Sequence, residues 1–163
     1  MKKILTDTYV FQGAEINGIE EGPNGVWGPK YTGEYRQGFL IQAPGIYTKI
    51  VTFDVRDGEV YDESYRVDPN TIGQFIGILD SQGMRIFSNS IVSMKIPSEN
   101  LNRWLTVRRY IHYDNRNCKW VLTNLPYELV NRDLTYDTIK RHNIRVVGVY
   151  YKNDVGEVIE HEF

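Results

Sequence analysis

The sequence predicts a β-rich α+β protein, and both its composition and its pattern of turns indicate this fold class. Twelve tyrosines, six phenylalanines and 14 glycines occur among the 163 residues, whereas alanine occurs only at Ala14 and Ala43. Aromatic residues favour strands, and glycine favours turns. Apolar, β-branched segments also alternate with turn residues along most of the chain, whereas only one segment has helical spacing. We therefore expect sheets to dominate and helix to be the minority state.

Predicted strands and tight turns alternate along the chain. Strand-forming residues occupy 39–42, 46–55, 60–61, 71–79, 84–87, 90–96, 107–113, 119–123 and 144–151. Pro44-Gly45 separates the first two segments, and Asp57-Gly58 is a favoured two-residue hairpin turn because both residue types tolerate positive φ. Residues 80–83 form a further turn. Pro97 is expected to end the strand before it, and 98–105 is either a capped helical turn or a polar loop.

One short helix is predicted near 133–142. Leu134, Thr138 and His142 recur there every four residues, and acids come first and bases last, as the helix dipole prefers. Asn143 directly follows this segment and is suited to a left-handed helix cap. The sequence therefore predicts a capped helix between the last two strands.

The chain is expected to form a single domain over 1–163, since 163 residues suffice for one buried core. It contains no fixed repeat, low-complexity tract or proline- and serine-rich linker. The segment 13–38 is rich in glycine and is predicted to be an irregular excursion around Trp27. Long loops often carry function, so Trp27 is a candidate binding residue. We expect the acidic tail after Asn153 to be loose.

The overall composition excludes several classes of protein. The chain is 41% apolar and 25% charged with a net charge of -2, unlike a disordered tail, a collagen-like repeat or a histone-like binder. Cys118 is the single cysteine, so no internal disulfide or cysteine-rich zinc site is expected, and a reducing cytoplasm fits best. The start at 1–7 lacks an apolar stretch, and no apolar run approaches the ~20 residues of a membrane span. We therefore expect a cytoplasmic protein without a signal peptide or a membrane partner.

Residues 67–92 resemble the central motif of the YopX family of phage and prophage proteins. The family typically carries Gly-Gln-aromatic-x-Gly-Leu-x-Asp-x-x-Gly-x-x-Ile-aromatic, followed by Glu-Gly-Asp-Ile-Val. Most of that spacing is present between Gly73 and Val92. Weaker similarity to the family's opening and closing segments occurs at 11–13 with 38–41 and at 144–150. The acidic Glu-Gly-Asp of the family is replaced here by Ser88-Asn89-Ser90, so no role of those carboxylates is carried over.

This resemblance implies a fold and a genetic context. It implies a small N-terminal α+β portion joined to a β-rich part similar to an SH3-like partial β-barrel, and the strand count agrees with a β-rich protein. It also implies a phage or prophage gene expressed in a bacterial cytoplasm. It implies no reaction, because the family has no established enzymatic chemistry.

Catalysis has little support in the sequence. His112, His142 and His161 lack metal-binding spacing, and with a single cysteine they predict no metal and no cofactor. His112 could act as a general base, but the solvent face of a strand is the simpler interpretation. Cys118 has basic neighbours and is either a reactive thiol or a small apolar filler. We therefore predict that the protein is not an enzyme.

Positive charge concentrates in the basic aromatic β segment 101–145, which holds nine lysines and arginines against four acids. The candidate binding residues of this segment combine guanidiniums with aromatic rings: Arg103, Arg108, Arg109, Tyr110 and Trp120. Trp27 is the sixth candidate binding residue. Cations interleaved with aromatic rings suit nucleic-acid backbones and bases. The same residue types are enriched at the hot spots of protein interfaces.

These residues lead to two hypotheses for the function. The first is a noncatalytic binding protein of a phage or mobile element that engages or inhibits a host protein, such as a CRISPR nuclease or another defence effector. The acidic hairpin 54–68 is then a candidate nucleic-acid mimic. The alternative is a nucleic-acid-binding accessory protein that uses the 103–120 surface, although a pI of about 5.9 argues against this class. A second copy of the chain is a further candidate partner.

Overall fold

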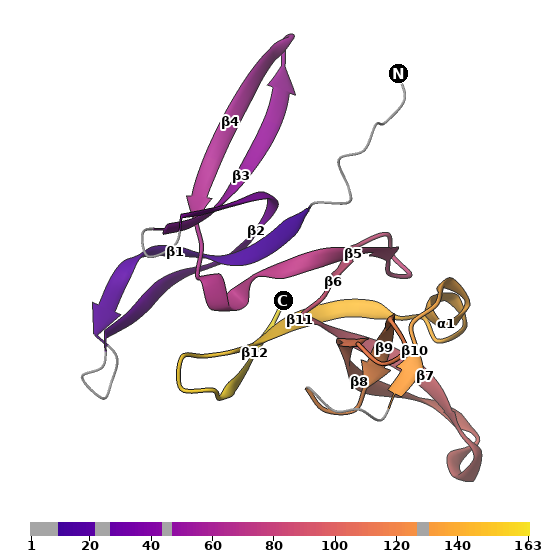
Figure 1. The fold of residues 1–163 in the computed structure, drawn as a ribbon. Helices are drawn as coiled ribbons and strands as arrows, with labels where there is room; N and C mark the ends of the chain where they lie inside the picture. The colour runs from indigo at the N-terminus through magenta and orange to yellow at the C-terminus, as the bar shows by residue number, and fades with distance from the viewer. Residues whose placement is uncertain (1–9, 22–26, 44–46, 127–130) are drawn as a thin grey trace. The chain divides into compact units, whose positions relative to one another are not determined.

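The fold is built from antiparallel strands (Figure 1). The computed structural model describes residues 10–21, 27–43, 47–126 and 131–163. They fall into two compact units, of which the first ends at Gln74 and the second begins at Phe75. The β-rich fold class is confirmed. That 1–163 forms a single domain stays a prediction, because one domain can consist of two compact units.

The first unit is a sheet in which four strands follow the order β4-β3-β2-β1. Its strands are β1 (Phe11–Glu21), β2 (Trp27–Ala43), β3 (Tyr47–Arg56) and β4 (Glu59–Arg66). The 3₁₀ helix η2 (Pro69–Thr71) leads into β5 (Gly73–Leu79), whose first two residues pair with the start of β1. Asp57 and Gly58 between β3 and β4 have φ values of +53° and +82°, so the predicted hairpin turn is confirmed.

The predicted glycine-rich excursion over 13–38 is wrong for its described residues, which belong to the long strands β1 and β2. Glycine here serves irregular strands instead of a loop. Gly18 and Gly33 have positive φ, and the register of the pair shifts twice between Ala14 and Ile19. Such bulges use the conformational freedom of glycine. Composition alone did not distinguish a bulged strand pair from an irregular loop.

The buried apolar residues of the first unit form a small core. They are Val10, Ala14, Ile50, Val51 and Val67. Polar groups complete this interior, because the Thr71 hydroxyl accepts a hydrogen bond from the backbone N–H of Ala14 at 2.9 Å. The Asp68 carboxylate caps η2 by accepting from the N–H of Asn70 at 2.9 Å.

The second unit contains the remainder of β5, which pairs with β6 (Arg85–Phe87), and a sheet of order β10-β9-β8-β7-β11-β12. That sheet consists of β7 (Ser90–Ser98), β8 (Arg103–Asp114), β9 (Lys119–Thr123), β10 (Asn131–Asp133), β11 (Arg145–Lys152) and β12 (Val158–Glu162). The 3₁₀ helix η3 (Glu99–Leu101) joins β7 to β8. The helix α1 (Tyr136–Arg141) precedes β11.

The predicted helix and its cap are confirmed, although α1 is shorter than 133–142. The hydroxyl of Thr135 accepts a hydrogen bond from the N–H of Thr138 at 3.1 Å and so begins the helix. Asn143 adopts the left-handed conformation with φ +46°. The next N–H, that of Ile144, donates to the carbonyl of Ile139 at 3.1 Å. These bonds satisfy backbone groups that a six-residue helix leaves open.

Two predicted boundaries in the second unit are wrong. β7 continues through Pro97, which pairs with Trp104 of β8. Proline is tolerated there because the other edge of β7 pairs with β11 only at 90–93, so no second neighbour needs the missing N–H. The tail after Asn153 also contains a strand, since β12 pairs with β11 along five residues.

The second unit buries a larger core against α1. Eight buried residues form it: Ile86, Val92, Met94, Ile111, Leu122, Leu134, Ile139 and Ile144. A smaller cluster on the opposite face of the sheet consists of Ile91, Tyr110 and Tyr150, with Val147 packed against them. Both faces of the central strands are therefore covered by side chains.

Both sheets are open, and no barrel closes among the described strands. The SH3-like partial barrel is not confirmed. The α+β character of the N-terminal portion is not confirmed either, since the described residues up to Gln74 contain strands and a 3₁₀ helix but no α-helix. Within the described parts of the chain, no helix has both the length and the apolar character needed to cross a membrane.

Candidate functional site

Alternation along β8 separates the candidate binding residues onto two faces of the sheet. Successive side chains of a strand point to opposite faces, and directly paired residues share a face. Arg109 pairs with Val92, which belongs to the core covered by α1. Tyr110 pairs with Ile91, which belongs to the cluster on the other face. Arg108 and Arg109 therefore point in opposite directions, although they are neighbours in sequence.

On the face that carries Arg108 and Tyr110, two glutamates compensate the positive charge of Arg108. The guanidinium of Arg108 lies 2.8 Å from a carboxylate oxygen of Glu160 and 2.7 Å from one of Glu162. The Tyr110 hydroxyl donates to the other oxygen of Glu160 at 2.6 Å, and its ring packs edge-on against Tyr150. Tyr110 is only 7% exposed. Burial, and secondly the bond to Glu160, raise the pKa of Tyr110.

The tryptophans and Arg103 occupy different environments. Trp120 is partly buried, packs against the larger core and contacts Tyr113 edge-on with ring centroids 5.0 Å apart. Arg103 and Trp104 are exposed at the start of β8. The backbone of Trp27 begins β2, but its side chain lies outside the described residues. The structure therefore does not gather the five candidate residues whose side chains it describes into one surface.

Arg109 lines a hollow on the helix-covered side of the sheet, which we name the arginine hollow. Its floor and rim are formed by Met94, Ile96, Pro97, Arg109, Leu122, Asn124 and Arg132. Its volume is about 340 Å³. Burial lowers the pKa of Arg109, and the nearby positive charge of Arg132 lowers it further. Two guanidiniums thus lie close together above apolar side chains.

Arg132 was missed in the sequence because β10 is only three residues long and carries no strand pattern. Its guanidinium lies 3.0 Å from Nε2 of His142, and Nδ1 of the same ring lies 2.7 Å from the carbonyl oxygen of Lys95. His142 is 9% exposed. Arginine is always a donor, so His142 accepts at Nε2 and carries its proton at Nδ1. The predicted helix-end position of His142 thus supports a polar contact between β7, α1 and β10.

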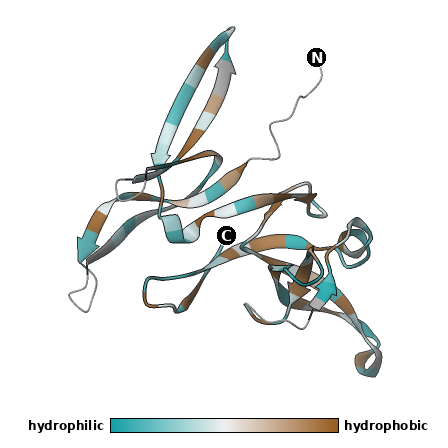
Figure 2. Cartoon of the chain, viewed as in Figure 1, coloured by the Kyte–Doolittle hydropathy of each residue, from teal (hydrophilic) through white to brown (hydrophobic). Residues whose placement is uncertain are grey.

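The first unit offers a second candidate surface, the β3–β4 arm (residues 52–63). β2 pairs with β3 only as far as Val51, whereas β3 pairs with β4 along its whole distal half. The arm is therefore a two-stranded ribbon that extends beyond the rest of its sheet (Figure 1). Phe53 is 58% exposed and Val60 is 67% exposed. Apolar residues recur on both strands of this ribbon (Figure 2).

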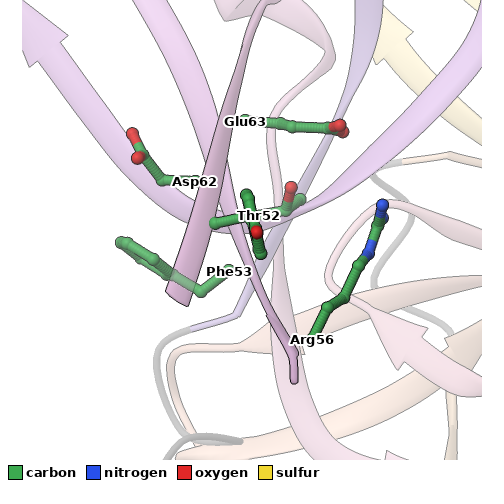
Figure 3. A pocket seen from close by; sticks show the side chains of 6 residues that line it. Thr52, Phe53, Arg56, Asp62 and Glu63 are labelled. Atoms are coloured by element: carbon green, nitrogen blue, oxygen red, sulfur yellow. The ribbon is translucent and has the colours of Figure 1, made fainter. Parts of the chain in front are cut away.

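The two faces of the β3–β4 arm differ in chemistry. Phe53 and Asp62 point to one side, whereas Arg56 and Glu63 point to the other (Figure 3). A hollow of about 330 Å³ is lined by these four residues with Thr52 and Tyr61. Arg56 also lies over the ring of Tyr61, 5.9 Å from its centroid. The arrangement suits a contact surface, because a two-stranded ribbon has no enclosed interior.

Cys118 and His112, the candidates for a reactive thiol and a general base, line neither of these two hollows. Cys118 is exposed in the β8–β9 turn with φ +50°, so it does not fill a gap in a strand. His112 is half-buried on β8. Among the described side chains, no three histidine, cysteine, aspartate or glutamate residues gather as metal ligands would.

The motif around Asp80 forms a structural turn. Oδ1 of Asp80 accepts hydrogen bonds from the N–H groups of Gln82 and Met84 at 2.8 and 2.9 Å. Oδ2 accepts from the N–H of Val146 in β11 at 2.9 Å, and Gly83 supplies the positive φ of the turn. Asp80 is buried, so its carboxylate organises the β5–β6 turn and ties it to β11.

The segment 88–90 forms the next turn, between β6 and β7. The hydroxyl of Ser90 is fully buried and accepts from the N–H of Phe87 at 2.9 Å. The carbonyl of Asn89 accepts from the N–H of Tyr150 at 2.9 Å. An uncharged hydroxyl and a backbone carbonyl therefore form the hydrogen bonds of this turn, where the family motif carries acids.

A family model described as YopX protein matches residues 32–155, which is most of the chain. The chain belongs to the YopX family. The resemblance stated from the sequence is thereby confirmed. None of the curated proteins matches the chain, and no solved structure does so either. YopX membership supports an origin in a phage or other mobile element and assigns no reaction.

Proposed function

We propose that this YopX protein is a noncatalytic binding protein that engages a host protein in the bacterial cytoplasm. The observation that carries the proposal is the β3–β4 arm, a ribbon whose apolar side chains are exposed without a covering layer. A two-stranded hairpin is marginally stable alone in water, so a partner that covers one face stabilises it. Phe53 also meets Phe39 edge-on with centroids 5.7 Å apart, which extends the apolar face onto β2.

Charge favours a basic partner for this surface. Residues 52–63 contain five acids and one arginine. An apolar centre with a charged rim is typical of protein interfaces, and a complementary rim increases the association rate. A nuclease of host defence fits this requirement, because proteins that bind nucleic acid carry basic surfaces. Occupation of such a surface would inhibit the nuclease without any chemistry by the YopX protein.

The alternative, a nucleic-acid-binding accessory protein, receives less support from the geometry. A surface over 103–120 would need Arg108 and Arg109 on one side, but they lie on opposite faces. Arg108 is also paired with two glutamates. We keep the arm as the preferred surface and treat nucleic-acid binding as an outcome of the test.

The test is affinity capture of the tagged protein from its bacterial host, with and without nuclease. The informative variant combines Phe53→Ser and Val60→Ser, which remove exposed apolar groups from the arm. Val155→Ser is the matched control, because Val155 is 79% exposed in the second unit. We expect one stoichiometric protein that survives nuclease, is retained by the control and is lost by the double variant.

Two results would contradict this proposal. Recovery of nuclease-sensitive material alone would favour the nucleic-acid alternative. A concentration-dependent dimer of the purified chain that dissociates in the double variant would make a second copy the partner. Light scattering of the purified protein and both variants distinguishes this case from a host partner.

A further inference from the structure

The arginine hollow contains two positive charges that no carboxylate compensates within the part of the chain that the structure describes. Neither Arg109 nor Arg132 forms an ion pair with a carboxylate among the described residues. A guanidinium carries five N–H donors. Arg109 uses a donor on the carbonyl oxygen of Arg108 at 2.6 Å, and Arg132 uses a donor on His142 at 3.0 Å. Most of the donors in this pair are therefore available to a ligand.

This arrangement is electrostatically unfavourable in the free protein. Two like charges repel, and the partial burial of Arg109 weakens the solvation that would offset the repulsion, whereas the Arg132 side chain is exposed. Both effects act on Arg109 and lower its pKa. The neighbouring Arg108 differs, because Glu160 and Glu162 compensate its positive charge. A bound anion would give Arg109 and Arg132 the compensation that no described carboxylate supplies.

The donors are also held in place before any ligand binds. The buried ring of His142 is fixed by the Lys95 carbonyl at Nδ1, and the N–H of Lys95 donates in return to the carbonyl of His142 at 2.7 Å. Nε2 of this fixed ring then orients the guanidinium of Arg132. Donors that are ordered in advance lose less conformational entropy on binding. An adjoining hollow shares Pro97 and Arg132 and carries Asp137 and Arg141.

We propose that the arginine hollow binds the phosphate group of a small phosphate ester, with Arg109 and Arg132 as the donors. The planar fork of a guanidinium matches two phosphate oxygens, and a dianion compensates both charges. The amide of Asn124 supplies a further polar group at the rim. Met94, Ile96 and Leu122 offer an apolar floor for the organic part of the ester. The volume of about 340 Å³ lies in the range of small-molecule pockets.

Two sources of this chemistry are a free mononucleotide and the phosphorylated end of a nucleic-acid strand. Calorimetric titrations distinguish them with four probes: inorganic phosphate, adenosine monophosphate, a 5′-phosphorylated oligonucleotide and the same oligonucleotide without the phosphate. We expect saturable binding of adenosine monophosphate that is tighter than that of inorganic phosphate. A preference for the phosphorylated oligonucleotide over both small probes would assign the site to a strand end.

Arg109→Met tests the site, and Arg108→Gln is its matched control on the opposite face. We expect Arg109→Met to weaken binding of adenosine monophosphate at least tenfold, about the loss of one charge-assisted contact. Thermal melting adds a second readout. Removal of an uncompensated charge should leave the melting temperature of the free variant unchanged or higher, whereas loss of a structural residue would lower it. Adenosine monophosphate should raise the melting temperature of the native protein but not that of Arg109→Met.

Three outcomes would overturn the proposal. One is the absence of saturable binding of any phosphate-bearing probe by the native protein. Another is an equal loss of binding in Arg108→Gln and Arg109→Met, which would indicate a diffuse positive surface. The third is unaltered binding in Arg132→Met. None of these outcomes depends on the host-protein proposal, which rests on the first unit.

Discussion

The β3–β4 arm and the central strands of the second unit are both antiparallel and both alternate in sequence, yet they differ in what covers their faces. β7, β8 and β9 have α1 and its core on one side and the tyrosine cluster on the other. The arm has neither, so Phe53 and Val60 remain exposed. Apolar residues on the strands therefore pack into a core in the second unit, whereas on the arm they stay exposed, which is the basis of the proposed docking surface.

The largest expected contrast between the regions is in stability. Ile111 is fully buried in the second unit, so Ile111→Ala should reduce the free energy of unfolding by about 2–5 kcal/mol. Phe53→Ala should change it by no more than about 1.5 kcal/mol, because the ring is 58% exposed and the main interaction lost is the edge-on contact with Phe39. Denaturant unfolding measures both. A loss in Phe53→Ala as large as that in Ile111→Ala would show that the ring belongs to a packed core, which would contradict the role of the arm as a docking surface.

A second comparison concerns glycines that lie close to the backbone of a neighbouring strand, one in each unit. A Cβ on Gly38 would lie 2.3 Å from the carbonyl oxygen of Val51, and one on Gly148 would lie 2.3 Å from that of His161. Each alanine substitution should therefore destabilise by about 1–3 kcal/mol, because backbone must move. Gly13→Ala is the milder control, since its nearest contact is the flexible end of Ile72 at 2.8 Å. Equal losses at Gly13 and Gly38 would contradict this explanation. Thermal melting of the three variants gives the comparison.

The smallest contrast is between two tyrosine–glutamate pairs. Burial first and the bond to Glu160 second raise the pKa of Tyr110, whereas the bond to Glu63 is the main cause that raises the pKa of Tyr65. A raised pKa means that the folded state retains the proton longer. The stabilisation is therefore complete below the ordinary pKa of about 10 and decreases as the pH rises through the folded value.

Tyr110→Phe should reduce stability at neutral pH by about 1 kcal/mol and flatten the alkaline dependence. Tyr65→Phe should have no measurable effect, because solvent screens the exposed pair. Ultraviolet absorbance titration, combined with unfolding at several alkaline pH values, checks both variants. An alkaline profile of Tyr110→Phe that matches the native profile would show that another group dominates this pH range.

Local signals in the sequence predicted much of the fold. Asp57-Gly58, the spacing of Leu134, Thr138 and His142, and the position of Asn143 each act within a few residues, and the structure agrees with them. The errors at 13–38 and after Asn153 share one cause. Pairing with a distant strand turned glycine-rich or acidic segments into strands, and such pairing leaves little trace in local composition.

The candidate sites were harder to predict for a geometric reason. Counting positive charge over 101–145 identified Arg109, but it could not show that Arg108 is compensated by glutamates about fifty residues away. Arg132 and His142 meet only because β10 pairs with β9 and α1 ends near β7. The exposure of Phe53 likewise depends on where β2 stops pairing. The central motif identified the family, and its residues form two consecutive turns.

The position of β4 at the edge of the first sheet affects how the chain behaves in solution. An edge strand offers unpaired backbone groups to which another strand can be added. Glu59, Asp62 and Glu63 lie on β4, so two copies of this edge would bring like charges together. High salt or acid pH weakens that repulsion. The acids on β4 thus disfavour strand addition between two copies of the chain. A partner strand with positive charges would pair with the same edge without this repulsion.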